Sequence, residues 1–74
     1  MKVPKYLVIY EREGRSYGAF VPDLPGCVAT GRSLATVKKR IREAIALHLE
    51  DMLARGESLP AAAAESEYVK AIPA

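Results

Sequence analysis

The sequence predicts an α+β fold, with a three-stranded antiparallel sheet, one long helix and a fourth strand in the order β-β-β-α-β. Short runs of β-branched and aromatic residues, separated by turn residues, occupy residues 6–30, as in strands joined by turns. An apolar stripe at three-and-four spacing occupies residues 34–55, as in an amphipathic helix. Between the two patterns, the run Pro22 to Cys27 holds two prolines and a glycine, which together favour a reversal of the chain.

The first two strands are predicted to form a hairpin. Tyr6 to Tyr10 is a β-branched and aromatic run, and the polar residues 11–15 after it supply the loop. Residues 16–21 return as the second strand, in which successive side chains point to opposite faces. One face of this strand meets the helix: either that of Tyr17, Ala19 and Val21 or that of Gly18 and Phe20.

The turn that holds Pro22, Pro25 and Gly26 is predicted to be structural. Each proline fixes its own φ near the polyproline value and pushes the residue before it toward extended geometry. Gly26 alone in this run takes a positive φ without penalty. Asp23 has two interpretations, because its carboxylate can accept from a nearby backbone N–H or present a negative charge to a basic partner.

A short third strand and the long helix follow the turn. Residues 27–30 form the strand, and Gly31 releases the chain toward Ser33, whose hydroxyl suits a helix N-cap. The helix is predicted over residues 34–55, and Gly56 suits its C-terminal stop. One amphipathic helix is therefore expected to pack across the sheet.

The predicted helix carries two apolar strips. The main strip faces the sheet and forms the core; it comprises Leu34, Val37, Ile41, Ala44, Ile45, His48 and Met52. A second strip, about a quarter turn away, includes Leu49 and Leu53 and is wider than one small sheet covers. A partner helix in a homo-oligomer or the C-terminal tail would cover it, and the sequence favours neither.

The charges of the helix run against its dipole. Lys38 and Arg42 lie in the basic N-terminal half, and the C-terminal end is acidic, with an Asp51–Arg55 pair at (i, i+4) spacing. Two copies packed antiparallel would bring the basic half of one helix against the acidic end of the other. This hypothesis assigns Lys38, Arg42, Leu49 and Leu53 to an oligomer interface. The competing interpretation is a solvated polar face.

The size of the chain limits its organisation to one domain. A chain of 74 residues buries only about 60% of its unfolded surface, which favours self-association as a dimer or tetramer. Residues 61–67 are predicted to be an alanine-rich connector, and residues 67–72 are predicted to form the fourth strand. All of residues 1–74 are thus assigned to a single domain.

The composition indicates a globular protein of the cytoplasm. Half of the residues are apolar and 27% are charged. No apolar run approaches the ~20 residues that a membrane span needs, and the N-terminus lacks the plan of a signal peptide. The single cysteine excludes an internal disulfide. The absence of Asn and Gln is compatible with a thermophilic source.

Three parts of the sequence, in order, resemble the HicB family of antitoxins: Tyr6-Leu7-Val8-Ile9-Tyr10, the run from Tyr17 to Cys27, and the helix start at Gly31 and Ser33. The resemblance spans about residues 4–60 and implies a truncated ribonuclease H-like fold. It also implies an antitoxin that neutralises a small, RNA-cleaving HicA-like toxin by binding it. Many members of the family append a C-terminal DNA-binding segment. None is recognised in this sequence, so DNA binding is not expected.

No catalytic or cofactor site is predicted. A metal-dependent nuclease needs converging carboxylates, whereas Glu11, Glu13 and Asp23 fall in predicted turns. Cys27 has no second cysteine at metal-site spacing and suits a small buried position. His48 lies on the apolar side of the helix, where a core or interface role is expected. The sequence therefore predicts a binding protein without metal or cofactor, and not an enzyme.

Two functions remain open at this point. The first is an inhibitor of a HicA-like toxin, with contacts at Glu11, Glu13 and Asp23, because a toxin that grips RNA is expected to be basic. The alternative is an RNA-binding or assembly module of the same fold without a toxin partner. It would use the basic helix surface and exposed tyrosines for stacking: Tyr6, Tyr10 or Tyr17.

Overall fold

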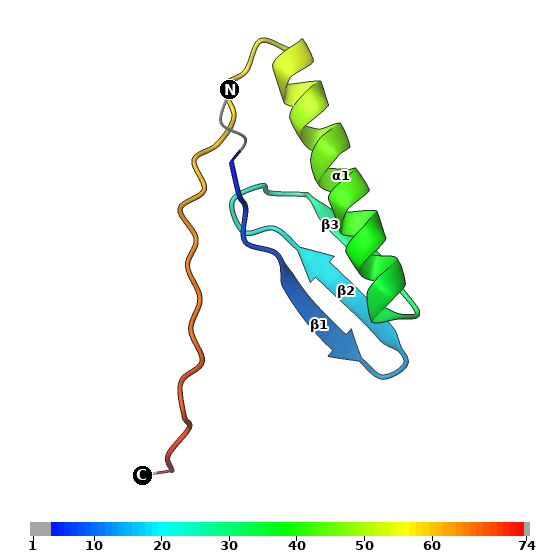
Figure 1. The fold of residues 1–74 in the computed structure, drawn as a ribbon, viewed down its shortest axis with the longest axis vertical. Helices are drawn as coiled ribbons and strands as arrows, with labels where there is room; N and C mark the ends of the chain where they lie inside the picture. The colour runs from blue at the N-terminus through cyan, green and yellow to red at the C-terminus, as the bar shows by residue number, and fades with distance from the viewer. Residues whose placement is uncertain (1–3, 74) are drawn as a thin grey trace.

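The computed structural model describes residues 4–73. Strand β1 spans Ile9–Glu13, β2 spans Ser16–Phe20, β3 spans Val28–Gly31, and helix α1 spans Leu34–Ala54. The strands form one antiparallel sheet in the order β1-β2-β3, and α1 lies across one face of it (Figure 1). The predicted α+β architecture of three strands and one helix is confirmed.

A two-residue turn at Gly14 and Arg15 joins β1 to β2. Gly14 has a φ of 60°, which suits the first central position of a type II′ hairpin turn. The turn places Glu13 opposite Ser16. Because the turn is this short, strand pairing begins directly beside it, and residues 11–13, predicted to be loop, belong to β1.

The predicted first strand, Tyr6–Tyr10, is wrong in its bounds, since β1 begins at Ile9. The register pairs Ile9 with Phe20, so continuing the ladder backwards would place Leu7 opposite Pro22. Proline has no N–H to donate to a ladder, and the chain turns away from the sheet there. The turn after β2 therefore also ends the pairing of β1.

Two consecutive β-turns form the connection from β2 to β3. One opens at Val21 with Pro22 in its second position, and the other opens at Leu24, and each is closed by a backbone hydrogen bond of 3.0 Å. Pro25 and Gly26 occupy the central positions of the second turn, and Gly26 has a φ of 83°. These are the conformations that a type II turn demands of a proline and a glycine.

The core lies between the sheet and α1 and includes the turn residues themselves. Its six buried members are Ala19, Val21, Leu24, Cys27, Val37 and Ile41. Val37 and Ile41 belong to the main apolar strip predicted for the helix, whereas Leu34 of that strip is 39% exposed. Ala19 and Val21 identify the face of β2 that meets the helix.

At both ends of α1, hydrogen bonds satisfy backbone groups that lack a partner within the helix. At the N-terminus, the Ser33 hydroxyl oxygen accepts a hydrogen bond from the Thr36 N–H over 3.1 Å, as the sequence predicts. At the C-terminus, Gly56 has a φ of 76° and the Glu57 N–H donates to the Met52 carbonyl over 2.9 Å. This is the Schellman arrangement, which ends a helix at a left-handed glycine.

Strand β3 approaches α1 most closely at Gly31. A Cβ atom at this position would lie 3.2 Å from Cγ2 of Thr36 and 3.4 Å from the backbone nitrogen of Val37. The first of these separations is shorter than an unstrained contact between two carbon atoms, and the second is at the limit of ordinary contact. The absence of a side chain at Gly31 thus lets the first turn of the helix sit directly on the sheet.

Beyond the helix cap at Glu57, the C-terminal tail of residues 58–73 is held to the body by three hydrogen bonds among the described residues. The Tyr6 hydroxyl donates to the Pro60 carbonyl over 2.6 Å. The N–H groups of Ala63 and Ala64 both donate to Oδ2 of Asp23, each over 3.1 Å. The tail then descends on the β1 side of the sheet, away from α1 (Figure 1).

The fourth strand predicted over residues 67–72 is not formed, because no strand is assigned to this segment in the structure. The tail leaves Tyr68, Val69 and Ile72 exposed. The backbone of helix α1 packs on β3 and β2, and it does not come close to that of β1. A strand added beyond β1 would therefore have no helix to bury its apolar side chains, and unburied strands contribute little stability.

Candidate functional site

The sheet has one face covered by α1 and one face without a covering element in residues 4–73 (Figure 1). We call the second face the outer face. Alternation along the strands assigns its members, since Ala19 points to the core and its neighbours point away. The outer face consists of Ile9, Glu11, Glu13, Ser16, Gly18, Phe20, Val28 and Thr30.

An apolar row crosses all three strands of the outer face. Ile9 pairs with Phe20 and Phe20 pairs with Val28, so the three side chains are direct cross-strand neighbours. Val28 is 61% exposed, and Ile9 and Phe20 are half-buried. The next position of β2 on the outer face is Gly18, so the surface beside Phe20 has no side chain there.

Two carboxylates lie on the same face, closer to the hairpin turn. Glu11 pairs with Gly18 and Glu13 pairs with Ser16, and both glutamates are exposed. Neither takes part in an ion pair within residues 4–73, where Arg55 makes the ion pairs observed. The structure thus brings Glu11 and Glu13 together beside the apolar row, with their charges uncompensated.

Asp23 lies apart from these glutamates, in the turn beyond the other end of β2. Its carboxylate accepts from the N–H groups of Ala63 and Ala64 in the tail, so the backbone donors are distant in sequence and not the nearby ones that the first interpretation expected. Its contact with a partner stays a prediction. Burial, and secondly the negative charge of Asp23, raise the pKa of the nearby Tyr6 hydroxyl.

The residues assigned to an oligomer interface all lie on α1. Leu49 packs against the core and is half-buried, Leu53 is 53% exposed, and Lys38 and Arg42 are exposed. The described part of the tail descends on the side of β1 (Figure 1), and Leu53 keeps 53% of its surface exposed in its presence. Self-association through these four residues of α1 stays a prediction.

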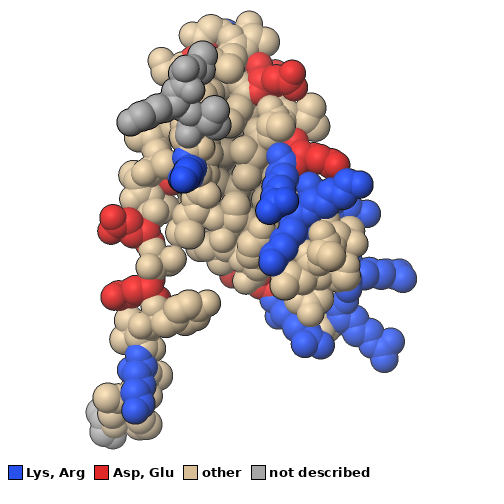
Figure 2. All heavy atoms as spheres, in the orientation of Figure 1, with Lys and Arg blue, Asp and Glu red and all other residues tan. Residues whose placement is uncertain are grey.

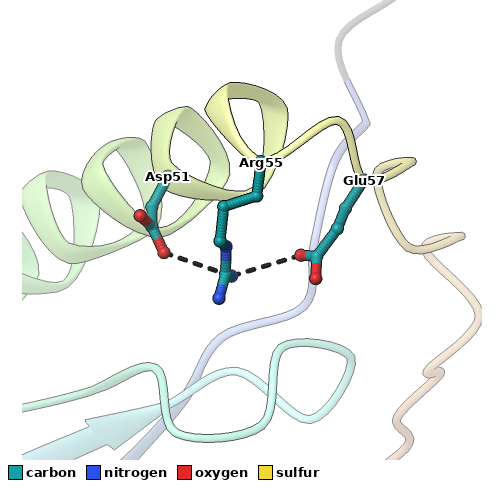
Figure 3. A network of polar contacts seen from close by, with 3 residues as sticks. All are labelled: Asp51, Arg55 and Glu57. Carbon is teal, nitrogen blue, oxygen red and sulfur yellow. Dashed lines mark hydrogen bonds and ion pairs between the residues drawn. The ribbon is translucent and has the colours of Figure 1, made fainter.

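The C-terminal end of α1 is fixed by a small charge network (Figure 3). Arg55 lies between two carboxylates, 3.1 Å from Asp51 and 3.2 Å from Glu57. The Asp51–Arg55 pair has the spacing that the sequence predicts. All three side chains are about half exposed, so the network contributes little stability, and the single positive charge of Arg55 offsets only one of the two negative charges.

The side chains that can bind metals or act in catalysis are dispersed over the described residues. No group of three metal-binding side chains occurs within residues 4–73. Cys27 is buried, and this burial raises the pKa of its thiol. His48 is half-buried on α1. Among the described helices, none is long and apolar enough to cross a membrane.

The apolar row was not predicted from the sequence. Placing β1 at Tyr6–Tyr10 hid the pairing of Ile9 with Phe20, and Val28 stood alone in a short strand. The signal was present in the hairpin, because a glycine followed by one further residue between two strands fixes the register. Counting back from Glu13 opposite Ser16 gives the pairing of Ile9 with Phe20.

The fold defines a small α+β domain of three strands and one helix, and comparison with known proteins gives its family. Residues 6–73 match the HicB-like antitoxins of bacterial toxin-antitoxin systems. The chain belongs to this family.

Several curated relatives are similar to the chain. A protein from the rep-hol intergenic region of Haemophilus phage HP1 is 34% identical over 64 residues, which cover 86% of this chain and 48% of the phage protein. A UPF0150 protein of Helicobacter pylori is 44% identical over 44 residues, 60% of this chain and 61% of that protein. The chain thus spans about half the length of the phage relative and under two thirds of the Helicobacter one.

A solved structure gives the same result for the fold. The structure is described as a HicA3 and HicB3 toxin-antitoxin complex, and a chain in it is similar to this one with a TM-score of 0.63 and 29% identity. The match covers 74% of this chain and 64% of the other.

Proposed function

We propose that the chain inhibits a HicA-like, RNA-cleaving toxin by binding it through the outer face of the sheet. Family membership and the similarity to a chain of a toxin-antitoxin complex support this function. The observation that carries the proposed surface is the apolar row of Ile9, Phe20 and Val28 beside two carboxylates that form no ion pair within residues 4–73.

The apolar row would supply affinity. Burying an exposed aliphatic side chain is worth about 1.5–3 kcal/mol when it is fully removed from water, and Val28 still has most of its surface to bury. The three side chains form one continuous strip, so a single complementary surface can cover them together. Protein interfaces commonly place such a dry centre within a polar rim.

Glu11 and Glu13 would supply the rim and the speed of association. A protein that grips RNA needs a basic surface, and two uncompensated carboxylates on a protein surface attract such a partner at long range. Charges at the edge of an interface act mainly on the association rate and its salt dependence. In this proposal the apolar row determines mainly the affinity of the complex, and Glu11 and Glu13 determine mainly its association rate.

The test is inhibition of RNA cleavage by the product of a neighbouring HicA-like gene, together with the kinetics of complex formation. The variant Val28→Lys should weaken the complex at least about tenfold by raising its dissociation rate. The variant Glu11→Lys/Glu13→Lys should slow association, most strongly at low salt.

The matched control is Glu43→Lys/Glu50→Lys, which makes the same charge change at exposed positions of α1. It should leave association nearly unchanged. If the unmodified chain fails to bind and inhibit the toxin, the proposed function is wrong. If it inhibits and the outer-face variants behave like the control, only the proposed surface is wrong.

A further inference from the structure

The helix-facing side of β1 is only partly covered, because α1 packs over β3 and β2 (Figure 1) and tail residues Ser66 to Tyr68 border Tyr10. Tyr10 and Arg12 of β1 point to this side, since they alternate with the outer-face residues. Tyr10 remains 37% exposed. A strip of the inner face therefore borders the helix without being covered by it.

Cations and aromatic rings alternate along this strip. Nζ of Lys38, which reaches down from α1, lies 5.9 Å from the centroid of the Tyr10 ring. Arg12 pairs with Tyr17 across the hairpin, and its guanidinium carbon lies 5.8 Å from the centroid of the Tyr17 ring. We call Tyr10, Arg12, Tyr17 and Lys38 the aromatic-basic strip.

Further cations lie at the same end of the molecule as the strip, although not all border it, since Arg40 contacts β3 at the opposite edge of the sheet. Figure 2 shows Lys and Arg side chains gathered over the N-terminal half of α1 and the hairpin end of the sheet. They come from three segments of the chain and include Arg12, Arg15, Arg32, Lys38, Lys39, Arg40 and Arg42. The ion pairs observed within residues 4–73 belong to Arg55, at the other end of α1.

Two of these arginines are held in place by neutral acceptors. Arg40 donates to the Thr30 carbonyl over 2.8 Å, and Arg12 donates to the Gly14 carbonyl over 3.3 Å. A carbonyl orients a guanidinium without neutralising it. The result is a fixed concentration of positive charge, despite a formal net charge of only +2 for the whole chain.

We propose that the aromatic-basic strip binds single-stranded nucleic acid, with phosphates on the cations and bases stacked on the ring of Tyr10 and on the part of the Tyr17 ring that does not pack against the core. Single-strand sites combine these two kinds of side chain, because every base offers a face for stacking and every nucleotide carries a charge. An acidic protein segment would pair with the cations but has no bases to stack on the tyrosine rings. A duplex hides its base faces and could not stack on them.

The strip is separate from the proposed toxin surface. Arg12 and Tyr10 alternate with Glu11 and Glu13 along β1, so the two sites lie on opposite faces of the same strand. Occupation of one leaves the other open. An antitoxin with both sites would hold the toxin on one face and a strand of the toxin's substrate class on the other.

The test is fluorescence anisotropy of a labelled oligouridine about 12 nucleotides long, titrated with the purified full chain from about 50 to about 200 mM NaCl. Binding should weaken with salt by about 0.7 of a logarithmic unit per phosphate contacted. The variant Arg12→Gln/Lys38→Gln should reduce this slope by the equivalent of about two contacts. The variant Tyr10→Leu should weaken binding about tenfold with an unchanged slope, since it removes stacking but no charge.

The matched control, Lys5→Gln/Lys70→Gln, removes two exposed lysines outside the strip and should keep nearly the affinity and slope of the unmodified chain. The DNA oligomer of the same sequence distinguishes the sources of the strand, because binding confined to RNA requires contacts with the 2′-hydroxyl. The proposal is overturned if the unmodified chain does not bind either oligomer at the lowest salt. It is equally overturned if a polyglutamate chain displaces the oligomer while Tyr10→Leu binds as tightly as the unmodified protein.

Discussion

The Tyr6 hydroxyl donates a hydrogen bond of 2.6 Å to the Pro60 carbonyl, joining the residues before β1 to those after α1. Asp23 holds the next part of the same tail through the N–H groups of Ala63 and Ala64. Two side chains, one before β1 and one in the turn from β2 to β3, thus position a tail segment that forms no strand or helix. The turn from β2 to β3 fills the core with Val21 and Leu24 and fastens the tail with the aspartate between them.

Removing the Asp23 carboxylate should release the tail without unfolding the body. Asp23→Ala leaves two N–H groups without their acceptor, and each hydrogen bond at such a partly exposed site is worth roughly 1 kcal/mol. Hydrogen exchange at Ala63 and Ala64 should then accelerate about fivefold or more, while exchange within α1 is unchanged. Asp23→Asn keeps one acceptor oxygen and should have an intermediate effect. Equal exchange rates in all three proteins would contradict the clamp.

Tail docking should also weaken at high pH, through Tyr6. Burial, and then the charge of Asp23, raise the pKa of the Tyr6 hydroxyl above its ordinary value of 10.0. A group whose pKa is higher in the folded state contributes its full stability below the unfolded value and loses it as the pH rises through the folded value. The contribution should therefore be constant below about pH 10 and decline above it.

The comparison variant for this effect is Tyr6→Phe, which keeps the ring and removes the donor. Urea unfolding across the alkaline range should show a steeper loss of stability in the unmodified chain than in Tyr6→Phe. The variant should also be less stable at neutral pH, by about 1 kcal/mol, because the Pro60 carbonyl loses its partner. Parallel pH profiles would show that Tyr6 titrates as it does in the unfolded chain.

The contact between β3 and α1 makes Gly31 the least replaceable glycine of the sheet. A methyl group there would meet Thr36 at 3.2 Å and the Val37 backbone at 3.4 Å, whereas at Gly18 its nearest neighbour would be the Ala29 carbonyl oxygen at 3.9 Å. Gly31→Ala should therefore lower the free energy of unfolding by about 1–3 kcal/mol. Gly18→Ala, the control, should stay within about 0.5 kcal/mol. Thermal unfolding of the two variants measures the difference, and equal stabilities would show that α1 shifts to accommodate the methyl group.

Local chemistry predicted most of this fold from the sequence. Gly26, Ser33 and Gly56 each have a backbone or capping role that few other residues fill, and the structure shows all three in those roles. The apolar strip of the helix likewise identified Val37 and Ile41. Such features depend on a residue and its near neighbours, so the sequence alone contains them.

Features that depend on pairing between distant segments were harder to predict. The bounds of β1 are set by Pro22, which removes a donor from the opposite strand, and this follows only once the hairpin register is known. The tail segment 67–72 has strand-forming residues, but β1 offers it an edge that α1 does not cover. The outer-face row of Ile9, Phe20 and Val28 was missed for the same reason. The placement of Glu11 and Glu13 beside it required the register as well.

Cys27 should be almost unreactive in the folded protein, because it is 3% exposed and burial raises the pKa of its thiol above the ordinary 9.0. The thiolate is the reactive form, so both effects suppress modification. At neutral pH, a disulfide reagent should react with the native chain at least about 100-fold more slowly than with the urea-unfolded chain. The variant Asp23→Ala shows whether the tail clamp also protects Cys27. If the reaction rate of Cys27 is unchanged in this variant, the thiol becomes accessible only by unfolding of the body. If the rate is faster, the tail clamp holds the turn closed. A native rate close to the unfolded rate would contradict the buried position of the thiol.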